Sequence, residues 1–145
     1  MVEVSKRDAI IEVVNRLFIF TDTQRWDKLL KDVFADKVAF DMSSVGGQKS
    51  TIRPQEICDM WRDGFKGIDS IQHLAGNYLV TIKEDVNAEV FCYANATHFK
   101  KNAKNGQVRE FVGTYDITLV FTDLGWRING FRYNLKYITG NASLE

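Results

Sequence analysis

Four long runs of β-type sequence, joined by short turns, fill the second half of this chain. The runs cover residues 70–82, 87–100, 108–121 and 126–137. The turn between the second and third runs contains Asn105-Gly106, a strong signal for a tight β-hairpin. Strands joined by tight turns pair antiparallel, so the pattern predicts a β-meander. A meander with an apolar face needs a second layer to cover it.

The first part of the chain has the helical spacing that could supply this layer. Ser5 and Asp8 resemble a helix N-terminal cap, and the pattern after them predicts a helix over residues 6–21. Its apolar face holds Ile10, Val14, Leu17 and Phe18. The other predicted elements are a short helix at 26–34, a strand at 37–42, a polar loop at 43–51 and a helix from Pro54 to Gly64 or Gly67. Helices followed by an antiparallel sheet predict an α+β fold.

The size and charge of the chain exclude several classes of protein. Its 145 residues predict one domain over 1–145, with residues 1–5 and 139–145 at the periphery. The 19 basic and 19 acidic residues balance, which disfavours nucleic acid as a partner. We expect no signal peptide and no membrane association, because no apolar run is long enough. Cys58 and Cys92 lie in apolar stretches without metal-ligand spacing, so we expect a cytoplasmic, reducing location.

Three residues could form an acid/base site. The chain has two histidines, His73 and His98, and both lie within predicted strands, while Asp22 closes the first predicted helix. Histidine moves protons near neutral pH, and a carboxylate partner orients it and raises its basicity. The alternative is structural, because a histidine on an apolar strand is often a hydrogen-bonded core residue and Asp22 could cap a turn.

Strand alternation predicts which side chains share a face with each histidine. On the second run, His98 follows a series of small side chains, namely Val90, Cys92, Ala94 and Ala96. Small side chains on a helix-covered face leave unfilled volume, which predicts a ligand pocket. On the first run, alternation places His73 with Ala75, Asn77 and Leu79. On the third run, Tyr115 would bring a hydroxyl group into an apolar face.

The order of several segments resembles that of the SnoaL-like family in the nuclear transport factor two-like superfamily. The segments are FTDTQRWDKLLKDVFADKVAFD, QHLAGNYLV, ANATHF, VGTYDITLVF and DLGWRI. The resemblance implies a cone, in which a curved antiparallel sheet wraps around three N-terminal helices and encloses one deep pocket. It also implies a homodimer that pairs through the sheet, where Phe91, Tyr93 and Phe99 could supply surface.

Within that superfamily, Asp22, His73 and His98 match positions used by the scytalone dehydratase-like branch. The resemblance implies that Asp22 pairs with His98, and that this dyad abstracts a proton from a carbon next to a carbonyl. His73 would bind or protonate the departing oxygen. The dehydratase has tyrosines at two positions where this chain has Thr21 and Phe40 or Asp41, so the reaction itself is left open.

These observations predict a cofactor-independent lyase or isomerase, of dehydratase type, that acts on a small apolar carbonyl-containing or polycyclic molecule. Asp22, His73 and His98 are its predicted catalytic residues. The predicted substrate-binding residues are Phe18, Trp26, Phe40, Trp61, Asn77 and Tyr115. We expect no metal, because the resemblance gives the aspartate and histidines a metal-free role, although such a set could form a facial triad. The alternative is a non-catalytic small-molecule-binding or dimeric association module of the same fold.

Overall fold

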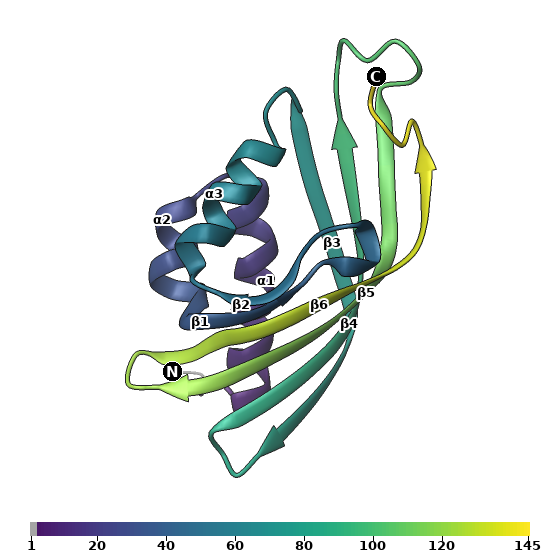
Figure 1. The fold of residues 1–145 in the computed structure, drawn as a ribbon. Helices are drawn as coiled ribbons and strands as arrows, with labels where there is room; N and C mark the ends of the chain where they lie inside the picture. The colour runs from purple at the N-terminus through teal and green to yellow at the C-terminus, as the bar shows by residue number, and fades with distance from the viewer. Residues whose placement is uncertain (1–2) are drawn as a thin grey trace.

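The computed structural model describes residues 3–145 as helices packed on one side of a curved sheet (Figure 1). The helical segments are α1 (Lys6–Asp22), α2 (Trp26–Lys28), a π-helical turn (Leu29–Val33), a 3₁₀ turn (Ser43–Val45) and α3 (Pro54–Gly64). The strands are β1 (Phe34–Asp41), β2 (Lys49–Ile52), β3 (Ser70–Lys83), β4 (Asn87–Phe99), β5 (Val108–Thr122) and β6 (Gly125–Gly140). The predicted α+β class and the four strands of the meander are confirmed.

Helix α1 begins and packs as its sequence predicts. The Ser5 hydroxyl accepts the backbone N–H of Asp8 at 3.0 Å, which satisfies one of the free N–H groups at the helix start. The apolar face is buried and includes Val13 as well as the four predicted residues. Thr21, in the last turn, is also buried, and its hydroxyl donates to the Leu17 carbonyl at 2.6 Å. The helix therefore carries Asp22, its last residue, up to the sheet.

The six strands form one sheet in the order β2-β1-β6-β5-β4-β3. All neighbouring pairs are antiparallel except β1 and β6, which run parallel. The sheet is therefore mostly antiparallel, and β3 forms one of its two edges. Its inner face and the buried faces of α1 and α3 share one apolar core.

Two predictions for the segment before α3 were wrong. The second helix breaks into α2 and the π-helical turn, and its last predicted residue, Phe34, begins β1. The predicted loop at 43–51 contains most of β2, which pairs with β1 from Val38↔Ile52 to Asp41↔Lys49. Strand β2 lies at the sheet edge with three of its four residues exposed, so it lacks the apolar alternation that identifies a strand.

A bulge in β3 changes which side chains face the core. The pairing with β4 shifts register between Gly76 and Leu79, and Asn77 adopts a φ of 56°. Beyond the bulge, Tyr78 packs against the core and its hydroxyl donates to Asn15, whereas Asn77 and Leu79 are exposed. The prediction that Asn77 and Leu79 share the face of His73 was therefore wrong, because one extra residue reverses the alternation.

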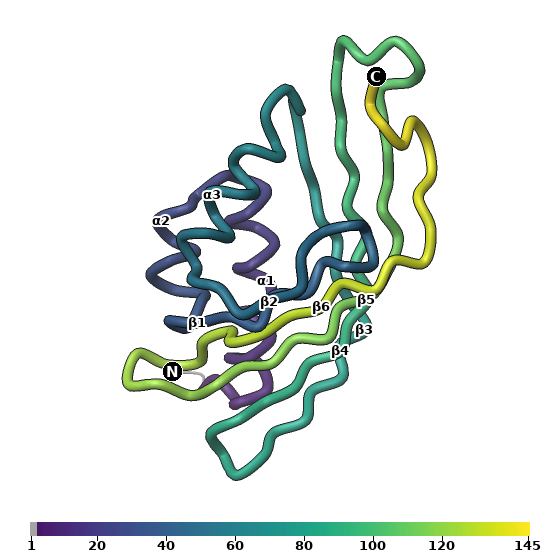
Figure 2. Tube along the Cα trace, in the orientation of Figure 1, coloured from purple at the N-terminus to yellow at the C-terminus, as the bar shows by residue number. Residues whose placement is uncertain are grey.

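The end of the chain lies beside the β4–β5 turn (Figure 2). Strand β6 continues to Gly140, the Leu144 side chain is buried, and the backbone N–H of Asn105 donates to the Glu145 carbonyl at 3.0 Å. Segment 139–145 thus contacts the β4–β5 turn, although most of its residues are exposed. No helix within residues 3–145 is long and apolar enough to cross a membrane.

Candidate functional site

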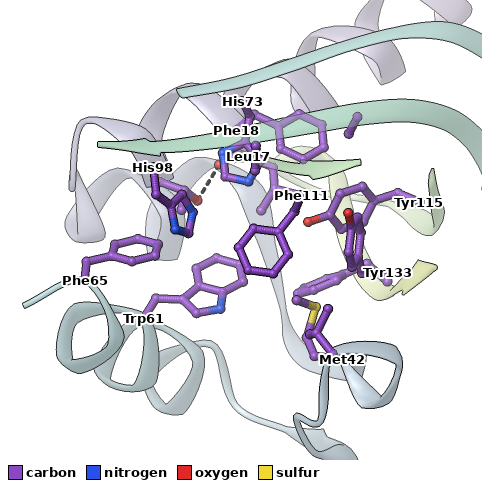
Figure 3. Close-up of a pocket in the computed structure, with 15 residues that line it drawn as sticks. Leu17, Phe18, Met42, Trp61, Phe65, His73, His98, Phe111, Tyr115 and Tyr133 are labelled. Carbon is purple, nitrogen blue, oxygen red and sulfur yellow. Dashed lines mark hydrogen bonds between the residues drawn. The ribbon is translucent and has the colours of Figure 1, made fainter. Parts of the chain in front are cut away.

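A cavity of about 190 Å³ lies between the helices and the inner face of the sheet. His73, His98, Phe18, Trp61 and Tyr115 line it, as the sequence predicted. Its remaining lining residues are Leu17, Thr21, Met42, Val45, Phe65, Ala94, Ala96, Phe111, Phe131 and Tyr133. The view in Figure 3 shows the two histidines toward one side and Tyr115 and Tyr133 toward the other, with Phe111 between them.

The small side chains of β4 form part of this cavity. Ala94 and Ala96 point inward with His98, in the alternation predicted from the sequence. In the sheet, Ala96 lies between His73 on β3 and Phe111 on β5. A methyl group at this position leaves open the space between a histidine and an aromatic ring. The prediction of unfilled volume over β4 is confirmed.

The end of α1 and the edge strand β3 form the acid/base pair. The Asp22 carboxylate lies 2.5 Å from the His73 ring through Oδ1 and Nδ1. Its second oxygen, Oδ2, accepts the backbone N–H of His73 at 2.7 Å. Both side chains are largely buried, with exposed fractions of 11% for His73 and 13% for Asp22. The Phe18 ring stacks on the imidazole at 5.2 Å between centroids, so the ring is held on its face as well as its edge.

Asp22 therefore pairs with His73, and the predicted Asp22–His98 dyad was wrong. The reason lies in the sheet order. Strand β3 is an edge, so the backbone N–H of His73 is free to bond outside the sheet, and the carboxylate at the end of α1 accepts it. Strand β4 is an inner strand that pairs with β3 and β5 along its length, and it offers no such group to Asp22.

His98 has a different partner. The Nε–H of Arg109, directly opposite on β5, donates to His98 Nδ1 at 3.0 Å. The His98 side chain is buried, and the Phe65 and Phe111 rings lie 6.3 Å and 5.3 Å from it. Burial, followed by the charge of Arg109, lowers the pKa of His98 to about 4. His98 is therefore neutral at neutral pH.

Two tyrosines bring hydroxyl groups to the cavity from β5 and β6. Tyr115 and Tyr133 are buried, with ring centroids 4.9 Å apart. Burial raises the pKa of both, to about 12 for Tyr133, so both are neutral phenols. The Tyr133 hydroxyl is buried and has no hydrogen-bond partner among residues 3–145. A side chain at Gly113 would begin 2.7 Å from that hydroxyl, so this glycine makes room for the Tyr133 ring.

Three predicted substrate-binding residues lie outside the cavity lining. Trp26 packs against Phe65, with ring centroids 6.1 Å apart, but does not itself line the cavity. Phe40 is almost fully buried, and it packs behind the cavity against Phe131 at 5.1 Å. Asn77 is exposed at the β3 bulge. Trp26 and Phe40 are thus part of the surrounding core, and Asn77 faces away from it.

Arg109 and Tyr133 were not identified from the sequence, although each leaves a weak signal. Arg109 faces His98 across the hairpin whose turn contains Asn105-Gly106, so the register of that hairpin could have found it. Tyr133 follows Phe131 on the inner face of β6 by simple alternation. Within residues 3–145 no group of three or more His, Cys, Asp or Glu side chains is arranged to hold a metal ion.

Comparison with known proteins gives the family and the fold. A family model described as the SnoaL-like domain matches residues 2–132. The Kfla4162 protein from Kribbella flavida is similar, with 26% identity, a TM-score of 0.89, and coverage of 96% of this chain and 95% of that one. No curated protein matches the chain.

Two more distant structures share the fold. A candidate aromatic ring hydroxylase from Novosphingobium aromaticivorans is 21% identical, with a TM-score of 0.81 and 99% of both chains covered. A candidate scytalone dehydratase from the same species is 15% identical, with a TM-score of 0.77, over 92% of this chain and 86% of that one. With the family model spanning most of the sequence, the chain belongs to the SnoaL-like family.

Proposed function

We propose that this protein is a cofactor-independent lyase or isomerase that removes a proton from a small, largely apolar carbonyl compound. The observation that carries the proposal is the Asp22–His73 pair, whose histidine lines an apolar cavity. A buried carboxylate beside a histidine is the arrangement that orients a general base and stabilises its charged form.

His73, rather than His98, is the proposed base. Asp22 accepts a hydrogen bond from the N–H at Nδ1, so the lone pair of the neutral ring lies on Nε2. This nitrogen has no hydrogen-bond partner among residues 3–145. When Nε2 takes a proton, the imidazolium is stabilised by the carboxylate 2.5 Å away. His98 lacks such a carboxylate, and its low pKa makes it a poor base near neutral pH.

The volume of the cavity limits the substrate. A cavity of about 190 Å³ is somewhat larger than the engineered cavity of about 150 Å³ that binds benzene. The proposed substrate is therefore a compound with one ring or of similar size. A polycyclic molecule, included among the substrates expected from sequence, would need a larger cavity than this one.

The proposed chemistry begins with the C–H bond next to the carbonyl. His73 Nε2 takes the proton, and the electron pair of the C–H bond enters the adjacent π-system. In an isomerisation the proton returns to another carbon. In a dehydration the electron pair forms a C=C bond as the neighbouring C–O bond breaks, and the proton leaves with that oxygen as water. The Tyr115 hydroxyl has no partner among residues 3–145 and can donate to the substrate oxygen.

The names of the structural relatives support this proposal only in part. A dehydratase performs an elimination of this kind, whereas a hydroxylase does not, and both share the fold at low identity. The position of the dehydratase tyrosine before Asp22 is Thr21, whose hydroxyl donates to a helix carbonyl. The argument for proton abstraction therefore depends on the geometry around His73.

The test is deuterium uptake from D₂O at the carbon next to the carbonyl, followed by proton NMR for a panel of single-ring ketones. Wild-type protein is expected to accelerate uptake, and His73→Asn to lose a factor of about 10²–10⁴. Asp22→Asn should also lose most of the acceleration, because it removes the charge that stabilises imidazolium. His98→Asn is the comparison variant: it should lose less exchange than His73→Asn, because His98 lines the cavity but is not the proposed base. Full exchange by His73→Asn, or a larger loss in His98→Asn than in His73→Asn, would overturn the assignment.

The same experiment addresses the non-catalytic alternative. A carrier needs only the cavity, so it would show shifts of the histidine ring signals on ketone binding without deuterium uptake.

The expected homodimer is also a proposal, supported by Leu74 and Leu79 on the edge strand, which are 72% and 69% exposed. Sedimentation of Leu79→Glu would test it, because a dimer through this surface should dissociate.

A further inference from the structure

Arg109 is held on three sides beside the cavity. Its Nε–H donates to His98 Nδ1 at 3.0 Å, and Nη1 donates to the Ala142 carbonyl at 3.0 Å. The guanidinium carbon lies 5.2 Å from the centre of the Phe111 ring, a cation–π contact. Strand pairing sets the position as well, because Arg109 is the β5 residue opposite His98. Arg109 is not one of the residues that line the cavity.

This contact determines where the proton of His98 resides. A guanidinium is permanently charged and offers only donors, so the nitrogen that faces it must be an acceptor. Nδ1 of a neutral imidazole accepts only when the proton is on Nε2. We propose that Arg109 is a positioning residue that holds His98 in the Nε2–H form, so that His98 serves the cavity as a hydrogen-bond donor and not as a base.

The charged and titratable groups around His98 lower its pKa, with one exception. Arg109 on β5 and His73 on β3 both lower its pKa, in addition to burial, whereas Asp22 on α1 raises it. The net result is a pKa of about 4, so the ring stays neutral through the physiological range. A neutral ring with Nδ1 occupied by Arg109 keeps its one N–H on Nε2 over that range.

The two histidines would then have opposite roles. His73 presents a lone pair and His98 presents an N–H to the same cavity. This step rests on the proposed function and narrows its substrate class. A substrate needs an acceptor oxygen to meet His98 in addition to a C–H bond to meet His73. A hydrocarbon of the same shape would cover the Nε2–H of His98 without offering it a hydrogen-bond acceptor, which is unfavourable.

The test is nitrogen-15 NMR of the two imidazole rings in protein without ligand. The chain has only two histidines, so His98→Asn assigns both sets of signals. Arg109→Met keeps much of the side-chain packing but removes the charge and the donor. Arg109→Lys keeps the charge but has a methylene group in place of the Nε–H that donates to His98. Arg132→Met is the matched control, because Arg132 pairs with Asp116 at 2.9 Å and its side chain is 58% exposed.

In wild-type protein we expect the His98 signals of a single Nε2–H form. In Arg109→Met the ring should show both tautomers, and its pKa should rise by about 1 yet remain below the ordinary value, since the ring stays buried. Arg109→Lys should also mix the tautomers, and Arg132→Met should change nothing.

A wild-type His98 protonated on Nδ1 would overturn the proposal, and so would an unchanged ring in Arg109→Met. If that variant does not fold, the wild-type spectrum and Arg109→Lys decide. These signals do not depend on turnover. Retained deuterium exchange in His73→Asn would refute the proposed function, but it would not affect the tautomer assignment of His98.

Discussion

Filling the cavity from β4 should make the protein more stable and prevent ligand binding. Ala96 lies between His73 and Phe111 on neighbouring strands, and it lines the cavity. In Ala96→Leu, an isobutyl group would occupy the space in front of His73 Nε2. If the cavity is kept open for a ligand, its emptiness costs stability, and a side chain that fills it should recover part of that cost.

The size of the effect follows from the added carbons. Leucine adds three carbon groups to alanine, and each buried group contributes about 0.8 kcal/mol, or about 2.4 kcal/mol together. Ordering the longer side chain costs about 0.5–1 kcal/mol. The cavity volume of about 190 Å³ exceeds that of the added group, so we expect little strain. We therefore expect a gain of about 1.4–1.9 kcal/mol in the free energy of unfolding, which corresponds to a rise in Tm of about 5 °C.

Urea denaturation measures the gain in the free energy of unfolding. Changes in the NMR chemical shifts of the His73 ring on titration with cyclohexanone report binding. Asn95→Leu is the control, because Asn95 is the preceding residue on β4 and faces the other side of the sheet. Only Ala96→Leu should gain stability and lose the ring shifts. A less stable Ala96→Leu, with Asn95→Leu unaffected, would show that the lining cannot accept an isobutyl group. Retained binding in a stabilised variant would refute this cavity as the ligand site.

Two further predictions concern single groups in the same cavity. Tyr133→Phe removes a buried hydroxyl without a partner, so thermal denaturation should show a gain of about 1 kcal/mol; a loss would mean that the hydroxyl is bound. The pKa of His98 is lowered to about 4, so between about pH 4 and 6.5 the unfolded chain binds more protons than the folded one. The free energy of unfolding should therefore fall as pH drops through this window, by up to about 3 kcal/mol, and His98→Asn should remove that dependence in urea titrations. An identical pH dependence in the variant would contradict the shifted pKa.

The elements that sequence predicted well are those with a local signal. Helix α1 and the four meander strands carry apolar patterns and clear turns, and their predicted ends lie within a few residues of the observed ones. Strand β2 lacks such a pattern because its side chains are mostly exposed at an edge. The parallel pairing of β1 with β6 joins segments about 90 residues apart in the sequence, and nothing local indicates it.

The residues of the site show the same contrast between local patterns, which sequence reveals, and features of the assembled sheet, which it does not. Alternation on β4 predicts that Ala94, Ala96 and His98 share one inner face, and the structure confirms it. The β3 bulge could not be located from the sequence, so Asn77 was assigned to the wrong face. The partner of Asp22 depended on which histidine lies nearest the end of α1, and that is a property of the assembled sheet.

Sheet position also explains why two chemically identical side chains differ in this protein. His73 is on an edge strand, where its backbone N–H is free to donate to the Asp22 carboxylate. The same carboxylate also contacts Nδ1 of the His73 ring. His98 is on an inner strand, where strand pairing occupies the backbone and the cross-strand neighbour supplies a cation instead. The His73 ring contacts a carboxylate, whereas burial beside a guanidinium opposes protonation of His98. The proposed division into base and donor therefore follows from the order of strands β3, β4 and β5, without any difference in the histidines themselves.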